Sequence, residues 1–292
     1  MEFGPLPPPL QALALVAAFA LGAVVGSFLN VCIYRLPRGE SIIAPRSYCF
    51  SCGARLTVLD LIPLLSFLAL RARCRHCGRR FSAQYFFIEL ATALLFLAAV
   101  RRFGVSLETF CVMAAGAALI VTFMIDLHHY IILDACVAIV LGTGVLLDAY
   151  RLVTGSTSFI THQESYGGLG LTVYLPRSIV GIVLGAGVFL AIGWVFNRVF
   201  GKLALGEGDA RLAAGVGAWL GPGYAFFAWF LMAVVVGAAI GVLAMALRLK
   251  RRREYIPFAP MLAASAITLM LWGEPITAWV MSIYGASAAP GS

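Results

Sequence analysis

Two acidic residues stand beside long apolar runs, where a carboxylate is costly. Asp126 ends the apolar run 110–125, and Asp209 closes the Gly-Glu-Gly-Asp segment 206–209 between two further apolar runs. A carboxylate in hydrocarbon costs about 2.5–3.5 kcal/mol even on the lenient insertion scale, so such residues mark functional sites. Two carboxylates held together can share one proton and activate water, which is the chemistry of an aspartic protease. We therefore predict that Asp126 and Asp209 form a catalytic dyad.

The glycines beside the second aspartate fit this chemistry. Gly206 and Gly208 have no side chain, so a substrate backbone could approach closely beside Asp209, and we predict that both contact the substrate. The residues alone also allow purely structural roles for the two aspartates. In that alternative Asp126 caps a helix or pairs with a neighbouring histidine, and Asp209 caps the helix that follows it.

The composition places the dyad in a membrane. Of 292 residues 62% are hydrophobic and 12% are charged, and the mean hydropathy is +0.96. Soluble domains contain about 25% charged residues, so we predict an all-α polytopic membrane protein. The net charge of +8 does not indicate a nucleic-acid partner, because the basic residues cluster between apolar stretches.

Eight apolar stretches follow one another along the chain, and we predict a transmembrane helix for each. The sixth is short and Gly-rich, which is typical of a broken or re-entrant helix covered by protein. The first has no basic residue before it and no clear cleavage site, so it is expected to be a retained span. The stretches are 10–34, 84–100, 107–125, 131–153, 178–199, 210–220, 224–247 and 258–284.

Charge sets the predicted orientation. Segment 35–83 carries nine Arg against two acidic residues, and segment 248–254 is strongly basic, so both are expected in the cytoplasm. Eight crossings put these two segments on the same side. Asp126 then lies at the end of the third crossing and Asp209 at the start of the sixth, both at the cytoplasmic face. Two arginines after the second stretch fall on the outer side and are an exception.

Segment 35–83 also contains four cysteines with metal-site spacing. Two Cys-x-x-Cys pairs, each followed by Gly, offer four thiolates to one tetrahedral ion, which predicts a structural zinc site. Disulfides are disfavoured in the reducing cytoplasm, and an iron–sulfur centre is the alternative metal centre. The predicted ligands are Cys49, Cys52, Cys74 and Cys77.

Three further polar residues are candidates for supporting roles. Glu89 lies inside the second stretch, where it could bind a substrate amine, assist methyl transfer or pair with an arginine of segment 35–83. Asp134 lies about 80° from the face of Asp126 on a continuous helix, which favours a supporting role. Asn30, inside the first stretch, is expected to hydrogen-bond to a neighbouring helix.

An ordered set of motifs resembles the bacterial type IV prepilin peptidases. It begins with residues 26–37 (Gly-Ser-Phe-Leu-Asn-Val-Cys-Ile-Tyr-Arg-Leu-Pro) and the two Cys pairs. It continues with Ile-Pro-Leu-Leu-Ser at 62–66, Glu-Leu at 89–90, Ile-Asp at 125–126 and Leu-Asp at 133–134. Gly-Glu-Gly-Asp-Ala-Arg-Leu at 206–212 and Ile-Pro-Phe-Ala-Pro at 256–260 complete it.

This resemblance implies an aspartic endopeptidase of the bacterial inner membrane. Its members cleave the basic leader from prepilins and pseudopilins after a Gly, and many then N-methylate the new terminus with S-adenosylmethionine. The family's catalytic aspartates carry over to Asp126 and Asp209. The implied partners are prepilin substrates and membrane lipids. The sequence does not set the oligomeric state.

The predicted layout has three parts. Residues 1–34 form the first transmembrane helix, 35–83 a cytoplasmic zinc-ribbon-like loop domain, and 84–292 a transmembrane peptidase domain with an exterior loop at 154–176. Two other function classes compete with this reading. One is a G-x-G-D protease of different specificity without methyltransferase activity, and the other is a non-enzymatic membrane protein whose acids carry protons or ions.

Overall fold

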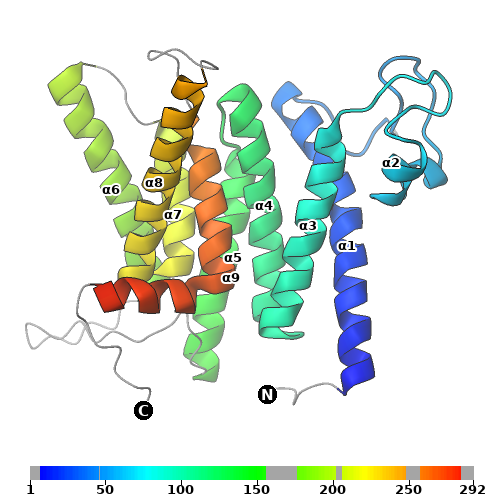
Figure 1. The fold of residues 1–292 in the computed structure, drawn as a ribbon. Coiled ribbons are helices and arrows are strands. Elements are labelled where there is room, and N and C mark those ends of the chain that lie inside the picture. The colour runs from blue at the N-terminus through cyan, green and yellow to red at the C-terminus, as the bar shows by residue number, and fades with distance from the viewer. Residues whose placement is uncertain (1–6, 46, 156–175, 202–205, 248–256, 284–292) are drawn as a thin grey trace, which may run out of the picture. The chain divides into compact units, whose positions relative to one another are not determined.

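The computed structural model of the chain describes residues 7–45, 47–155, 176–201, 206–247 and 257–283, and these are mainly helical (Figure 1). No strand occurs in these residues, only two isolated β-bridges. The long helices are α1 (Pro8–Arg35), α3 (Ala83–Phe103), α4 (Leu107–His129), α5 (Asp134–Thr154), α6 (Arg177–Phe200), α8 (Tyr224–Ala246) and α9 (Ala259–Ile283). The shorter elements are η1 (Leu36–Arg38), η2 (Val58–Leu61), α2 (Leu65–Ala69) and α7 (Glu207–Leu220).

Each of the eight predicted apolar stretches coincides with most of one helix, which confirms the predicted fold class. Seven helices of the described chain are long and apolar enough to cross a membrane. The exception is α7, which has 14 residues and corresponds to the short sixth stretch. Large apolar side chains such as Val183, Trp194 and Val235 are exposed along the long helices, as expected of surfaces that face lipid. The basic segment 248–254 and nearly all of the predicted exterior loop lie outside the described residues.

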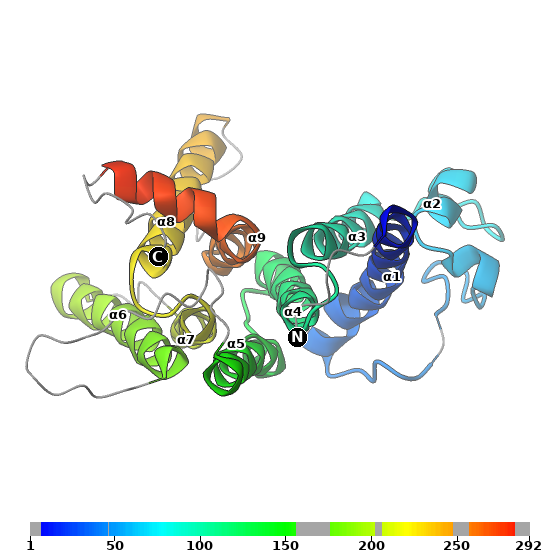
Figure 2. The same ribbon diagram turned by 90° about the horizontal axis from the view of Figure 1, so that it is seen from below.

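Contacts divide the chain into two compact units, Met1–Val121 and Thr122–Ser292, with the boundary inside α4. In the first unit α1 and α3 lie side by side (Figures 1 and 2). Their backbones approach closely at glycines, because a Cβ at Gly22 or at Gly26 would lie 2.7 Å from a Cα of α3. Asn30 of α1 donates its side-chain amide to the Tyr85 carbonyl at 3.2 Å, which confirms the predicted hydrogen bond between helices.

The segment between α1 and α3 is irregular and is held at its start by a buried arginine. The Arg35 guanidinium donates to the carbonyls of Ser41 at 2.9 Å and of Pro45 at 2.8 Å. Further along, the Thr57 hydroxyl and Arg75 both hydrogen-bond to the Asp60 carboxylate, at 2.7 and 2.9 Å. These side-chain bonds supply order that a segment without regular secondary structure cannot obtain from its backbone.

The second unit is arranged around α7, which lies between α5 and α6 (Figure 2). Small residues let α6 and α7 touch through their backbones. A Cβ at Gly181 would lie 1.9 Å from the Gly217 carbonyl oxygen, and one at Gly185 would lie 2.2 Å from that of Ala213. On the other side the Trp219 indole donates to the Val140 carbonyl of α5 at 2.8 Å. This short helix is therefore fixed on two faces.

Helical geometry is interrupted at two places that affect where side chains lie. The chain leaves helical geometry between α4 and α5, where Tyr130 has a φ of +57°. The rotation expected between Asp126 and Asp134 on one continuous helix was therefore wrong, because they lie on different helices. Helix α9 bends at Trp272, three residues before Pro275, as a proline inside a helix requires (Figure 1).

Candidate functional site

The two predicted catalytic aspartates come together in the second unit. Asp126 lies in the last turn of α4 and Asp209 in the first turn of α7, and they are 6% and 5% exposed. Their carboxylates interact electrostatically, and the backbone N–H of Ala259, the first residue of α9, faces Asp126. Helix N-termini favour negative charge, so α7 and α9 both stabilise carboxylates at this place.

The structural alternative for Asp209 is partly realised. Its carboxylate accepts the backbone N–H of Gly206 at 3.3 Å, which is an N-terminal cap of α7. A cap needs only one oxygen and is usually solvated, whereas here a second buried carboxylate stands in the same place. Capping alone therefore does not account for the pair.

The two glycines of the motif differ in their surroundings. Gly206 is exposed, and a Cβ there would meet only the Asp209 carboxylate at 3.7 Å and a backbone nitrogen at 3.9 Å. A Cβ at Gly208 would lie 3.2 Å from the Ile132 side chain. Gly208 thus has a packing reason to lack a side chain, and Gly206 has the more open backbone.

Asp134 and Arg211 form an ion pair between α5 and α7. Arg211 lies two residues after Asp209, so this pair ties the first turn of α5 to the helix that carries the second aspartate. Both side chains are mostly exposed, which limits the contribution of the pair to stability. The pair therefore acts mainly to position α7 relative to α5.

A different buried acid, Asp148, was not singled out in the sequence. Its carboxylate accepts the backbone N–H and the hydroxyl of Ser178, at 2.9 and 2.7 Å, and so caps α6. Only its place inside an apolar stretch, where an acid is rare, could have marked it.

The four cysteines of the first unit form one cluster. All four sulfur atoms lie within 4.8 Å of one another, and Cys49 and Cys77 are 3.9 Å apart. A tetrahedral zinc with bonds of about 2.3 Å sets its sulfurs about 3.8 Å apart, so the cluster fits such an ion. The predicted grouping of Cys49, Cys52, Cys74 and Cys77 is confirmed as a possible metal centre.

The two halves of the cluster repeat the same turn. In each, the amide of the residue after the second cysteine donates to the first cysteine's carbonyl: Gly53 to Cys49 at 2.8 Å and Gly78 to Cys74 at 2.9 Å. Gly53 and Gly78 have φ values of +69° and +68°, which other residues rarely adopt. The glycine after each Cys pair is therefore needed to close the knuckle.

The thiols of the cluster influence one another. Burial opposes ionisation of Cys49, but hydrogen bonds from the amides of Ser51 and Cys52 and from the Cys74 thiol lower its pKa to about 6. For Cys52 a hydrogen bond from Ala54 favours the thiolate, yet burial and the neighbouring thiols raise its pKa to about 11. One sulfur ionises at the expense of another, and a bound dication would favour thiolate in all of them.

Glu89 has neutral hydrogen-bond partners. Its carboxylate accepts the backbone N–H of Leu64 at 2.8 Å and faces the Ser27 hydroxyl. Leu64 has a φ of +61°, an uncommon conformation for a residue other than glycine. Of the three roles weighed for Glu89, pairing with an arginine is not seen, because the ion pairs Arg75–Asp60 and Arg211–Asp134 do not include it.

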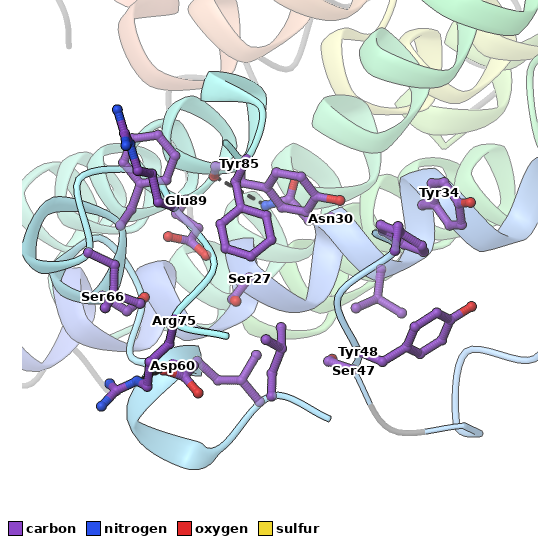
Figure 3. Close-up of a pocket in the computed structure, with 18 of the residues that line it drawn as sticks. Ser27, Asn30, Tyr34, Ser47, Tyr48, Asp60, Ser66, Arg75, Tyr85 and Glu89 are labelled. Carbon is purple, nitrogen blue, oxygen red and sulfur yellow. Dashed lines mark hydrogen bonds and ion pairs between the residues drawn. The ribbon is translucent and has the colours of Figure 1, made fainter. Parts of the chain in front are cut away.

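Glu89 and Asn30 line a cavity of about 140 Å³ in the first unit (Figure 3). Helices α1 and α3 provide one wall and the irregular segment between them the other. The sequence did not reveal this cavity, because residues from five separate stretches line it. Its polar and aromatic lining includes Ser27, Tyr34, Tyr48, Phe50, Asp60, Arg73, Arg75 and Tyr85.

Comparison with known proteins agrees with the motifs. Residues 20–103 match the family described as Bacterial Peptidase A24 N-terminal domain, and residues 113–242 match the Type IV leader peptidase family. No solved structure is significantly similar to the chain.

Three curated relatives illustrate the similarity, and each is named prepilin leader peptidase/N-methyltransferase. The protein of Pseudomonas putida is 30% identical, over 93% of this chain and 95% of its own length. That of Aeromonas hydrophila is 32% identical, over 92% and 93%. That of Bacillus subtilis is 35% identical, over 91% and 97%.

Proposed function

Because the chain belongs to the type IV leader peptidase family, we propose that it removes the basic leader peptide of type IV prepilins or pseudopilins, cutting after a Gly, and then N-methylates the new N-terminus. The observation that carries the peptidase step is the pair of buried carboxylates, Asp126 and Asp209, in electrostatic contact. The protein is proposed to lie in the bacterial inner membrane, with both aspartates at the cytoplasmic face, where a basic leader would remain.

The dyad supplies the acid and the base that peptide hydrolysis needs. One carboxylate takes a proton from water, and the water oxygen attacks the scissile carbonyl. The protonated carboxyl then donates to the leaving amine, so a single shared proton serves both steps. Gly206 supports this mechanism, because its exposed backbone lies beside Asp209 and leaves room for an extended substrate.

Zinc is proposed as a structural component. Cys49, Cys52, Cys74 and Cys77 would hold one ion, and four thiolates leave no open position for a reacting water. The ion would order a segment that has little regular secondary structure of its own. The proposed parts are then a first helix over 1–34, a zinc-binding loop over 35–83 and a peptidase over 84–292.

Methylation is proposed from the name that the relatives share. S-adenosylmethionine would supply a methyl group whose bond to sulfur breaks as the amine nitrogen bonds to the carbon, leaving a neutral thioether and a proton that passes to water. The protein must bind this cation and present it to an uncharged terminal amine. The polar cavity of the first unit is lined by a buried carboxylate, Glu89, and by arginines, among them Arg73.

One experiment tests both steps. The purified full-length protein is mixed with a peptide that has a basic leader followed by Gly-Phe, with and without S-adenosylmethionine, and the products are identified by mass spectrometry. We expect cleavage after the Gly and the gain of one methyl group on the new terminus only when the donor is present. The Asp126→Asn variant is the matched control, and cleavage by this variant would refute the dyad.

The same experiment decides the second candidate function. Cleavage without methyl transfer would favour a G-x-G-D protease that lacks the second activity. Intact peptide after incubation with the well-folded protein would refute the peptidase proposal itself.

A further inference from the structure

The irregular segment of the first unit contains an apolar stretch whose side chains face outward. Residues 58–70 (Val-Leu-Asp-Leu-Ile-Pro-Leu-Leu-Ser-Phe-Leu-Ala-Leu) include one charged residue, Asp60. Its carboxylate accepts hydrogen bonds from the Thr57 hydroxyl and from Arg75, so this charge has partners within the protein. The most exposed large apolar side chains of the stretch are Val58 (81%), Leu59 (63%), Leu65 (66%) and Leu68 (61%). An exposed apolar patch of this kind marks an interaction surface.

Two contacts place this stretch beside the beginning of α3. The Leu64 amide donates to the Glu89 carboxylate at 2.8 Å, and the rings of Phe67 and Phe86 have centres 5.4 Å apart. Helix α2, which contains Phe67, lies beside α1 and α3 rather than beyond their ends (Figures 1 and 2). Glu89 is six residues from the first residue of α3, which is about 9 Å along the helix axis. The stretch is therefore level with the first two turns of a helix that is long and apolar enough to cross a membrane.

The backbone of the stretch is suited to leaving water. Hydrocarbon offers no hydrogen-bond partners, so amides at the membrane boundary need partners within the protein. The amides of Ser66, Leu68 and Leu70 each donate to the carbonyl four residues earlier, at 3.0, 3.2 and 2.9 Å. Proline at position 63 has no amide hydrogen, and the next amide, of Leu64, is bonded to Glu89. These amides would keep their partners in contact with lipid.

Basic residues border the stretch on both sides. Arg55 precedes it, Arg71, Arg79 and Arg80 follow it, and all four are exposed. Segments with an apolar side and a basic border lie in the membrane interface, with the apolar side chains about 5–10 Å inside the boundary of headgroups and acyl chains. This depth agrees with the contact to Glu89 in the second turn of α3. The same positive charge would repel a basic peptide, which argues against a prepilin leader as the occupant.

We propose that residues 58–70 form an interfacial membrane anchor. Leu65 and Leu68 lie among the acyl chains of the leaflet beside the start of α3, and the exposed arginines bind the phosphates of anionic lipids. In the proposed orientation this is the cytoplasmic leaflet. The anchor holds the zinc-binding segment, of which it is a part, against the membrane surface. The inference depends on neither leader cleavage nor methylation, and its tests need no turnover.

Photo-crosslinking in a bilayer identifies the occupant of the patch. The photoreactive amino acid p-benzoylphenylalanine replaces Leu65 or Leu68 in the full-length protein, which is placed in nanodiscs of phosphatidylglycerol and phosphatidylethanolamine with a prepilin-like peptide present. After irradiation, mass spectrometry should find adducts with lipid acyl chains at both positions. The same group at His76, an exposed residue of the second Cys knuckle, should give at least about tenfold fewer acyl adducts. Adducts with the peptide or with a second copy of the chain in place of lipid, or equal acyl adducts at all three positions, would overturn the proposal.

Sensitivity to trypsin measures how firmly the anchor is held. Cleavage after Arg71 in anionic nanodiscs should become at least about tenfold faster in Leu65→Asp, because an acidic side chain disfavours the membrane boundary. Val105→Asp places the same charge on an exposed apolar residue just after α3 and should leave the rate unchanged. Both variants should keep the zinc content of the wild type. An unchanged cleavage rate in Leu65→Asp would contradict the anchor.

A measurement on the wild-type protein covers the case in which Leu65→Asp fails to fold. Each basic side chain near an anionic surface strengthens attachment about fivefold, so two such arginines give about 25-fold. Cleavage after Arg71 should therefore be at least about tenfold slower in nanodiscs that contain phosphatidylglycerol than in phosphatidylcholine alone, and high salt should remove the difference. A soluble reporter peptide in the same sample corrects for any effect of the lipid on trypsin. Equal rates in the two lipids would refute the binding of phosphates by the arginines.

Discussion

Substitution of Gly185 by Ala should move Asp209, the second aspartate of the proposed dyad. Gly185 faces α7, and an added Cβ would lie 2.2 Å from the carbonyl oxygen of Ala213, where ordinary contact begins at 3.4 Å. The shortfall is 3.4 − 2.2 = 1.2 Å. The opposing atoms belong to the backbone of a helix, so they cannot rotate away as a side chain could. Helix α7 must therefore shift.

The shift should affect catalysis more than folding. Ala213 lies one helical turn after Asp209, so most of a displacement of about 1 Å reaches the carboxylate. A misplacement of about 1 Å can cost about 10²-fold in rate, whereas overpacking typically costs about 1–3 kcal/mol in stability. We expect kcat/KM for leader cleavage to fall about 100-fold in Gly185→Ala.

The assay is cleavage of the prepilin-like peptide, followed together with thermal unfolding of each purified variant. The matched control is Gly187→Ala on the same helix, because a Cβ at Gly187 meets no atom within 4 Å. The control should stay within about twofold of wild type, since alanine also favours the helix. Equal activity of the two variants, with both folded, would refute the idea that close packing of α6 and α7 positions Asp209.

Three further outcomes follow from the two units. Asp126→Asn and Asp209→Asn should each abolish leader cleavage without changing the bound zinc, and a full rate in either variant would remove it from the dyad. Cys74→Ser should lower the zinc content, measured by metal analysis, from one ion towards none, while Cys111→Ser in α4 should keep it. Hydrogen bonds from Thr57, and then Arg75, hold the pKa of Asp60 below its usual range. The loop stability that Asp60 adds is therefore present above its unfolded pKa of about 3.9 and lost as pH falls through the lower folded value. Limited proteolysis of wild type against Asp60→Asn should show this difference shrinking below about pH 4, and a constant difference would contradict it.

Much of the fold could be predicted because membrane spans depend on composition over a long window. The first apolar stretch and α1 differ by two residues at one end and one at the other. The short sixth stretch was also expected to be unusual, and α7 is short. The sequence could not show why this stretch is rich in glycine. The structure shows that α6 and α7 contact each other through backbone atoms at glycines. Glycine content indicates close packing but does not identify the partner.

The candidate site was predictable where the chemistry is local. The Cys pairs were recognisable because a knuckle is formed by adjacent residues. The pairing of Asp134 with Arg211 joins residues 77 positions apart, and no periodicity predicts it. The contact of Leu64 with Glu89 was hidden for a further reason. A positive φ is normally expected at glycine, and a leucine gives no sign of one.

The motifs shared with the prepilin peptidases are distributed over both units, which bears on where each of the two proposed activities lies. The dyad and the Gly-Glu-Gly-Asp segment belong to the second unit. The motifs at 62–66 and 89–90 belong to the first unit, where the Leu64 amide meets the Glu89 carboxylate. Asn30, from the motif at 26–37, lines the same cavity. Peptide hydrolysis by a carboxylate pair needs none of these three residues. Glu89 and Asn30 line one cavity, and Leu64 binds Glu89. A second chemistry explains this arrangement better than hydrolysis does, and the one that the relatives' shared name provides is methyl transfer.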